Sequence, residues 1–129
     1  MADESYPEEL RYHPEHDWAR VEGTEATFGI TWYAQDSLGE VVFFEAPEVG
    51  SEVSKDSGYA EVESVKAVSD VIAPLSGEIL EVNDALQDAP EQINEDPYGA
   101  GWLVKVRLTS PEETETLLGV QEYRKMLDR

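Results

Sequence analysis

Short stretches in which apolar and polar residues alternate dominate the chain, and they predict a protein made mainly of β-strands. We expect ordered structure from residues 17–21 onward. Strands are predicted at residues 27–30, 41–44, 58–65, 68–73, 79–82 and 102–108, with a loop-rich segment at 84–101. Many short strands followed by one terminal helix favour a sandwich or barrel.

Two helices are predicted outside this pattern. Thr31 is a suitable cap for a brief helix that runs to Leu38, and Gly39 can close it in the left-handed conformation. Near the end of the chain, Ser110 is predicted as the cap of a single terminal helix, and Glu113 as its capping-box partner. One apolar face of that helix would carry Leu117, Val120, Tyr123 and Leu127.

The length of the chain favours one domain. A sequence of 129 residues is large enough to bury its own core, so we expect a single domain over residues 1–129 with a flexible lead at 1–9. No apolar run approaches the length of a membrane span, and the acidic N-terminus lacks the apolar stretch of a secretory signal. Cysteine is absent, which excludes disulfides and fits a cytoplasmic location.

Acidic residues outnumber basic ones by 29 to 9, for a formal net charge of −20. Nucleic acids and anionic membranes would be repelled, since binding to them depends on lysine and arginine. Two interpretations of the charge remain: a halophilic surface adapted to high salt, or an acidic face for a basic partner. The acids are spread along the whole chain, which favours the salt interpretation.

Lys66 is unusual in this acidic chain. It and Lys55 are the only basic residues between Val21 and Val104. The two predicted strands around it favour a hairpin with Lys66 near the tip, where an exposed amine could hold an amide-linked cofactor. Periodicity alone still favours an ordinary solvated lysine in a turn.

Other site chemistry has little support in the sequence. His13 and His16 are the only histidines, and Pro14 between them works against the helical presentation of a metal-binding pair, so we expect no metal site. Phosphate-binding glycine loops and catalytic-triad motifs are missing. The three tryptophans are expected to pack in the core.

Several separated motifs resemble those of the glycine cleavage system H-protein family, in the same order. The run VESVKAVSDVIAPLSGEILEVN at 62–83 is similar to its lipoylation segment. FGIT at 28–31, LGEVVF at 38–43, PEVG at 47–50, PYG at 97–99 and GWL at 101–103 also follow the family pattern. The resemblance covers about residues 10 to 127.

This resemblance implies a lipoyl-type barrel-sandwich hybrid of two sheets, with a short internal helix and a C-terminal helix. It implies that lipoic acid is attached through an amide to Lys66, by lipoyl-attaching enzymes that recognise its neighbours Glu63, Ser64, Val65 and Ala67. The protein would be a carrier and not an enzyme. Its arm would take an aminomethyl group from glycine decarboxylase to a tetrahydrofolate-dependent aminomethyltransferase, and dihydrolipoyl dehydrogenase would then reoxidise it.

The family's loaded arm folds into a surface cleft, and the matching positions here are Glu15, Asp17 and Asp70. Carboxylates there would suit a primary ammonium group. The chain departs from the family at these positions: Asp17 replaces a usual glutamate, Glu15 a small polar residue, and Ser37 a frequent histidine. Asp17 and Glu15 could equally be two more acids on an acidic surface.

Two other carrier functions stay open, a relay of lipoyl groups to other enzymes and the arm of a 2-oxoacid dehydrogenase. Dehydrogenase arms usually have Asp-Lys-Ala at the turn, whereas this chain has Val65-Lys66-Ala67 and continues into a terminal helix. The Met-Lys-Met of biotin carriers is absent. The intact lysine segment argues against a scaffold that has lost its cofactor.

Overall fold

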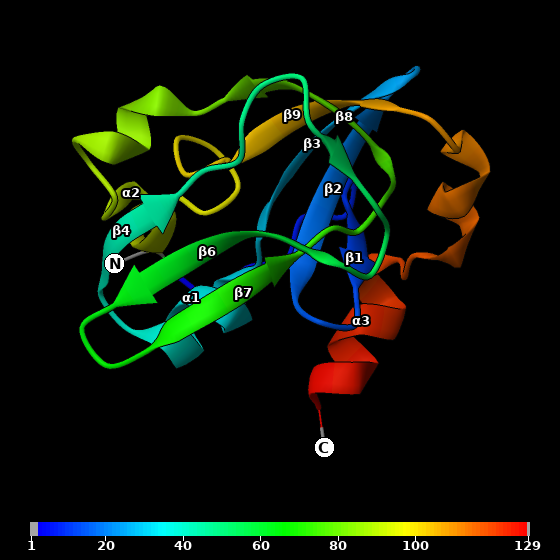
Figure 1. Ribbon diagram of the computed structural model, residues 1–129. Coiled ribbons are helices and arrows are strands. Elements are labelled where there is room, and N and C mark those ends of the chain that lie inside the picture. Colours follow the sequence, from blue (N-terminus) through cyan, green and yellow to red (C-terminus); the bar gives the residue numbers. More distant parts are fainter. Residues whose placement is uncertain (1–2, 129) are drawn as a thin grey trace.

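The computed structural model describes residues 3–128 and has two antiparallel sheets with short helices around them (Figure 1). The larger sheet has the order β1 (Arg11–His13), β2 (Asp17–Glu22), β3 (Glu25–Ile30), β9 (Val104–Leu108), β8 (Gly77–Val82) and β5 (Glu52–Val53). The smaller sheet has the order β4 (Val41–Glu45), β6 (Gly58–Ser64) and β7 (Val68–Ile72). The predicted mainly β fold of two sheets is confirmed.

The main core lies between the two sheets. Its buried side chains include Phe28 of β3, Ile79 of β8 and Val106 of β9 from the larger sheet, and Phe44 of β4 and Val62 of β6 from the smaller. Phe44 and Val62 are directly paired across the small sheet, so they point to the same face. Each such side chain stabilises the fold by roughly 1.5–3 kcal/mol through its burial.

A second group of buried residues, called here the aromatic cluster, comprises Tyr6, Leu10, Tyr12, Trp18 and Tyr123. Tyr12 and Tyr123 stack with ring centroids 4.7 Å apart, and Tyr6 meets both rings edge-on. Tyr6 lies within the expected flexible lead at 1–9, and its ring is buried against the terminal helix. Residues 1–2 lie outside the described part of the chain.

The single terminal helix predicted from Ser110 is wrong. The chain forms a 3-10 helix, η2 (Pro111–Thr116), and then a separate α-helix, α3 (Val120–Leu127). The Glu113 carboxylate does not cap η2. It accepts hydrogen bonds from the backbone N–H and hydroxyl of Ser76, at 2.8 and 3.0 Å. The capping contact instead belongs to α3, where Glu122 accepts from the N–H of Gly119 at 2.7 Å.

The internal helix α1 (Trp32–Leu38) is confirmed, with the N–H of Ala34 donating to the Thr31 hydroxyl at 3.2 Å. The segment predicted to be loop-rich contains the 3-10 helix η1 (Asp84–Gln87) and the α-helix α2 (Gln92–Glu95), and the strand expected at 102–108 begins at Val104. None of the helices in residues 3–128 is long and apolar enough to span a membrane.

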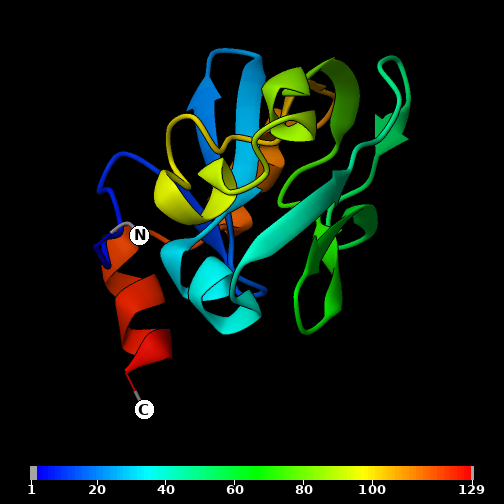
Figure 2. The same cartoon turned by 90° about the vertical axis from the view of Figure 1, so that its left-hand side faces the viewer.

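The buried Asn94 of α2 holds the junction between α1 and β4. Its amide nitrogen donates to the side-chain oxygen of Gln35 at 3.0 Å and to the carbonyl of Gly39 at 2.8 Å. Its amide oxygen accepts from the N–H of Val41 at 2.9 Å. This junction lies beside the β6–β7 hairpin, and Figure 2 shows α1 between that hairpin and α3.

Candidate functional site

Lys66 lies in the connection between β6 and β7, as the sequence predicts. The connection is closed by Ser64, whose N–H donates to the carbonyl of Ala67 at 2.8 Å. The Ser64 hydroxyl oxygen also accepts from the N–H groups of Lys66 and Ala67, at 3.3 and 3.1 Å. The N–H of Val65 is bound to the carbonyl of Glu40 at 3.0 Å. The backbone of the tip is therefore fixed, while the Lys66 side chain is exposed.

The surroundings of Lys66 are apolar and open. Val65 is 66% exposed and Val68 is 61% exposed, so both flank the lysine without covering it. The lysine stem passes the turn at Gly39 (φ 83°), where a Cβ atom would lie 3.5 Å from the Lys66 Cε. Such an amine is accessible to a modifying enzyme, and a group attached to it can reach the neighbouring hollow of the surface.

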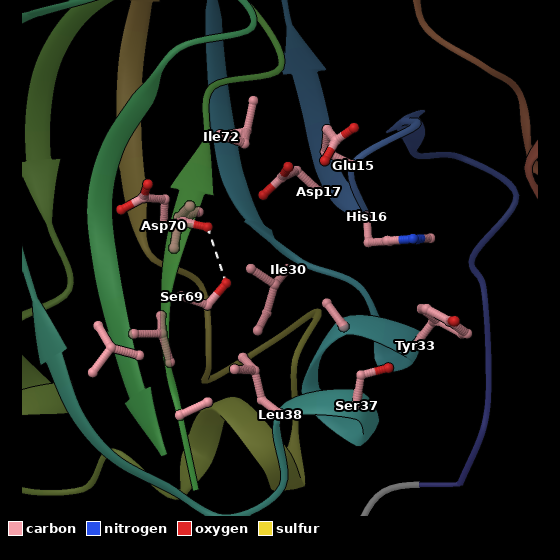
Figure 3. Close-up of a pocket in the computed structure, with 15 residues that line it drawn as sticks. Glu15, His16, Asp17, Ile30, Tyr33, Ser37, Leu38, Ser69, Asp70 and Ile72 are labelled. Carbon is pink, nitrogen blue, oxygen red and sulfur yellow. Dashed lines mark hydrogen bonds between the residues drawn. The ribbon is translucent and has the colours of Figure 1, made fainter.

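That hollow is a cleft of about 440 Å³ bounded by β2, α1 and β7 (Figure 3). Ala67 and Val68, the residues that follow Lys66, form one of its edges. Ile30, Leu38 and Val68 are among its apolar residues, and three carboxylates also line it: Glu15, Asp17 and Asp70. The structure thus brings together the three acids that the sequence singled out.

Asp17 is the unusual member of this group. It begins β2, paired with His13 on one side and Ile30 on the other, and its side chain points into the cleft. The residue is only 2% exposed, and its Oδ2 atom has no hydrogen-bond partner among residues 3–128. Burial, and then the charge of Glu15, raise the pKa of Asp17 well above its ordinary value, against a backbone hydrogen bond from Ile72 that lowers it.

Tyr59 supplies a second buried polar group that sequence reasoning missed. It lies at an irregularity in β6, since Gly58 pairs with Ile72 while Ala60 pairs with Val71. The ring packs edge-on against Phe28, and the buried hydroxyl has no hydrogen-bond partner among the described residues. Burial, and then the neighbouring Asp17, raise the pKa of Tyr59. Strict alternation would place Tyr59 on the same face as the exposed Glu61 and Glu63, so the sequence pattern predicts neither its inward position nor its proximity to Asp17.

His16 forms part of the cleft wall through an uncommon backbone conformation, with φ at 75°. Its carbonyl accepts from the N–H of Thr31 at 3.0 Å, and its Nδ1 lies 2.8 Å from the hydroxyl of Tyr123. The ring lies against that of Tyr33, with centroids 4.4 Å apart. Ser37 of α1 lines the same cleft, so the serine that departs from the family pattern is a cleft residue.

The two histidines do not converge on a common point. His13 is bound through Nε2 to Asp56 at 2.6 Å, whereas His16 is bound to Tyr123. Within residues 3–128, no group of three or more histidine, cysteine or acidic side chains could hold a metal ion. The site combines an exposed amine with a cleft lined by three carboxylates.

Comparison with known proteins gives one consistent result. The model of the family "Glycine cleavage H-protein" matches residues 10–129. The chain is 54% identical over 119 residues to the mitochondrial glycine cleavage system H protein of Pisum sativum, covering 92% of this chain and 72% of the relative. It is 51% identical over 117 residues to the glycine cleavage system H protein of Symbiobacterium thermophilum, covering 91% of each.

A solved structure agrees with these sequence matches. The crystal structure of a glycine cleavage system H protein from Mycobacterium marinum superposes with a TM-score of 0.88 at 42% identity. The similarity covers 96% of this chain and 100% of that one. Sequence and fold therefore agree over nearly the full length.

Proposed function

The chain belongs to the glycine cleavage H-protein family, and from that membership we propose that Lys66 is the residue that carries its lipoic acid. Members of this family are lipoyl carriers in glycine cleavage and are not enzymes, and this chain has that role. The observation that supports Lys66 is its position: an exposed amine on a fixed hairpin tip, directly beside the cleft.

The cleft suits a tethered arm. When bound, lipoate supplies the thiol–disulfide chemistry that carries a one-carbon amine fragment derived from glycine. The apolar Ile30, Leu38 and Val68 can pack against an alkyl chain that enters from the tip, while the carboxylates of Glu15, Asp17 and Asp70 can surround a terminal ammonium group. A group sheltered there is separated from bulk water.

The buried Asp17 has a specific role in this proposal. Burial disfavours the charged form of its carboxyl group and raises its pKa, because an isolated charge is costly there. An ammonium group that enters the cleft supplies the missing opposite charge, which favours ionisation of Asp17. The cleft would then hold the cation through a close charge pair.

We further propose that the chain acts as a single carrier domain serving three enzymes: glycine decarboxylase, the tetrahydrofolate-dependent aminomethyltransferase and dihydrolipoyl dehydrogenase. Lipoyl-attaching enzymes would recognise Lys66 through its neighbours Glu63, Ser64, Val65 and Ala67. The buried Ser64 supports this, because its hydroxyl fixes the backbone on which the lysine is presented.

The acidic surface is proposed to be an adaptation to high salt, in a cytoplasmic protein. Glu45, Glu61 and Asp70 lie opposite one another across the small sheet, where like charges repel. Desolvation, and then the charges of Glu45 and Asp70, raise the pKa of Glu61. Dissolved salt screens such repulsion, so the free energy of unfolding should rise with added KCl. Equal stability in dilute buffer and in concentrated KCl would contradict the salt adaptation.

The attachment site can be tested on protein purified from its native cells. Mass spectrometry of the peptide that contains Lys66 should show the mass of an amide-linked lipoyl group. Lys66→Arg should abolish glycine-dependent CO₂ exchange in a reconstituted system without a change in melting temperature, while the control Lys55→Arg should keep the exchange. A peptide that is always unmodified, or exchange that survives in Lys66→Arg, would overturn the proposal.

A further inference from the structure

His13 is the last residue of β1, before the turn that leads to the cleft residues Glu15 and Asp17, and its ring makes two specific contacts. The residue is 5% exposed, in β1. Its Nδ1 accepts a hydrogen bond from the backbone N–H of Glu15 at 3.0 Å, and its Nε2 lies 2.6 Å from Oδ1 of Asp56. A backbone N–H can only donate, so Nδ1 must be unprotonated and Nε2 must carry the hydrogen that faces Asp56. The contacts themselves define the tautomer.

Asp56 is a well-fixed acceptor for this ring. It adopts a left-handed conformation with φ at 74°, and its N–H is bound to the carbonyl of Ala73 at 2.8 Å. Lys55 Nζ also donates to Asp56 Oδ1 at 3.0 Å. The hydrogen bond from His13, and then that from Lys55, lower the pKa of Asp56. The ring thus connects two parts of the chain. It is bound to Asp56 in the connection between β5 and β6, and to Glu15 in the turn between β1 and β2.

We propose that His13 is a positioning residue for the cleft, whose neutral ring fixes the Glu15 backbone and so the orientation of the carboxylates at the cleft entrance. This inference rests on the proposed function, since it assigns His13 a part in holding the cationic end of the arm. The 2.6 and 3.0 Å contacts link the β1–β2 turn to Asp56, so Glu15 cannot shift without breaking one of them.

The same geometry makes the contact sensitive to acid. The ionisable groups that face or adjoin the ring are Glu15, Asp17, Lys55 and Asp56. A second proton on the ring would occupy Nδ1, and the N–H of Glu15 would then face another N–H instead of an acceptor. Asp56 would still attract the charged ring, so acid should release Glu15 selectively while the link to Asp56 persists.

Two substitutions separate the contacts of the ring. The amide of an asparagine branches at the same distance from the backbone as Nδ1, so His13→Asn keeps an acceptor for Glu15 and loses Asp56. A glutamine amide reaches the position of Nε2, so His13→Gln keeps a donor for Asp56 and loses Glu15. Both residues are neutral amides, and each serves as the control for the other.

The first measurement is hydrogen exchange of the Glu15 amide by NMR in the unmodified chain. At equal global stability, exchange should be about fivefold faster in His13→Gln than in the parent or His13→Asn, as expected for the loss of one hydrogen bond. Acidification should accelerate exchange in the parent relative to His13→Asn. Identical exchange in all three proteins at every pH would overturn the positioning role, whether or not Lys66 is lipoylated.

The second measurement uses the lipoylated, aminomethyl-loaded carrier. Spontaneous release of ammonia should be about fivefold faster from His13→Gln than from His13→Asn, with a step toward acid pH in the parent alone. Equal release rates and pH profiles, combined with a confirmed exchange difference, would overturn the link between His13 and the arm. An unmodified Lys66 peptide would instead contradict the proposed function, so the two failures are distinguishable.

Discussion

Asp17 and Trp18 are neighbours in β2, yet their side chains lie in two different regions. In the region of Trp18 the buried polar group has a hydrogen-bond partner, whereas in the region of Asp17 a buried polar atom has none among the described residues. Trp18 points into the aromatic cluster, where its indole N–H donates to the carbonyl of Pro97 at 3.0 Å. Asp17 points into the cleft, where its Oδ2 has no partner among the described residues. Alternation along the strand places the two side chains on opposite faces.

The comparison extends to the tyrosines. In the aromatic cluster, the hydroxyl of Tyr123 lies 2.8 Å from both His16 and Thr31, and that of Tyr12 donates to the carbonyl of Pro7 at 2.7 Å. Tyr59, which is close enough to Asp17 to be affected by its charge, has a buried hydroxyl with no such contact among residues 3–128. Satisfied polar groups fix one structure, whereas unsatisfied groups leave capacity for a ligand at a cost in stability.

The largest effect is expected for Asp17→Asn, which removes the unmatched acid from the cleft. Because the folded-state pKa of Asp17 is raised, the folded chain keeps a proton that the unfolded chain loses near pH 3.8. Wild-type stability should therefore fall as the pH rises above about 4, until the folded pKa is passed. At neutral pH, the variant should be more stable by about 1–3 kcal/mol.

Denaturant unfolding at several pH values measures this difference. The exposed Asp36→Asn changes the net charge equally and serves as the control. Asp17→Asn should also weaken retention of the aminomethyl group, because a neutral amide cannot pair with an ammonium ion. If the variant is destabilised and the pH dependence is unchanged, Asp17 does not bear the unfavourable charge that we assign to it.

The sequence predicts local features of the fold better than contacts between residues that are far apart in the chain. The cap at Thr31 and the hairpin around Lys66 are local features, and the structure confirms them. The prediction of one terminal helix from Ser110 is wrong. Its expected capping residue, Glu113, instead accepts hydrogen bonds from Ser76, which is 37 positions away in the chain. Competition of that kind depends on tertiary contacts and leaves no local pattern.

The same limit applies to the site. Lys66, Glu15, Asp17 and Asp70 were identified through family motifs, and the structure brings the three acids together in one cleft. His13, which sequence reasoning considered only as a metal ligand, is instead bound to Asp56, 43 residues away. Nothing in the local sequence distinguishes a buried histidine with two partners from an exposed one.

A smaller effect of the opposite sign is expected in the aromatic cluster. Tyr123→Phe keeps the stacked ring but removes the hydroxyl that contacts His16 and Thr31. Losing the two hydrogen bonds of the hydroxyl should destabilise the fold by about 1–2 kcal/mol in chemical unfolding. His16 should also lose part of its restraint at the cleft wall, visible as faster hydrogen exchange of the Thr31 N–H. Unchanged stability would mean that water replaces the hydroxyl without loss.

The smallest effect is expected for Tyr59→Phe, the same chemical change at the tyrosine near Asp17. No hydrogen bond among the described residues is lost, and the ring still packs against Phe28. Removing a buried hydroxyl without a partner should leave the free energy of unfolding unchanged or raise it by less than about 1 kcal/mol. The two Tyr→Phe changes should therefore differ in sign when both are measured by denaturant unfolding at neutral pH. A loss in Tyr59→Phe as large as that in Tyr123→Phe would show that Tyr59 has a polar partner in solution, such as a bound water, and the contrast between the regions would then rest on Asp17 alone.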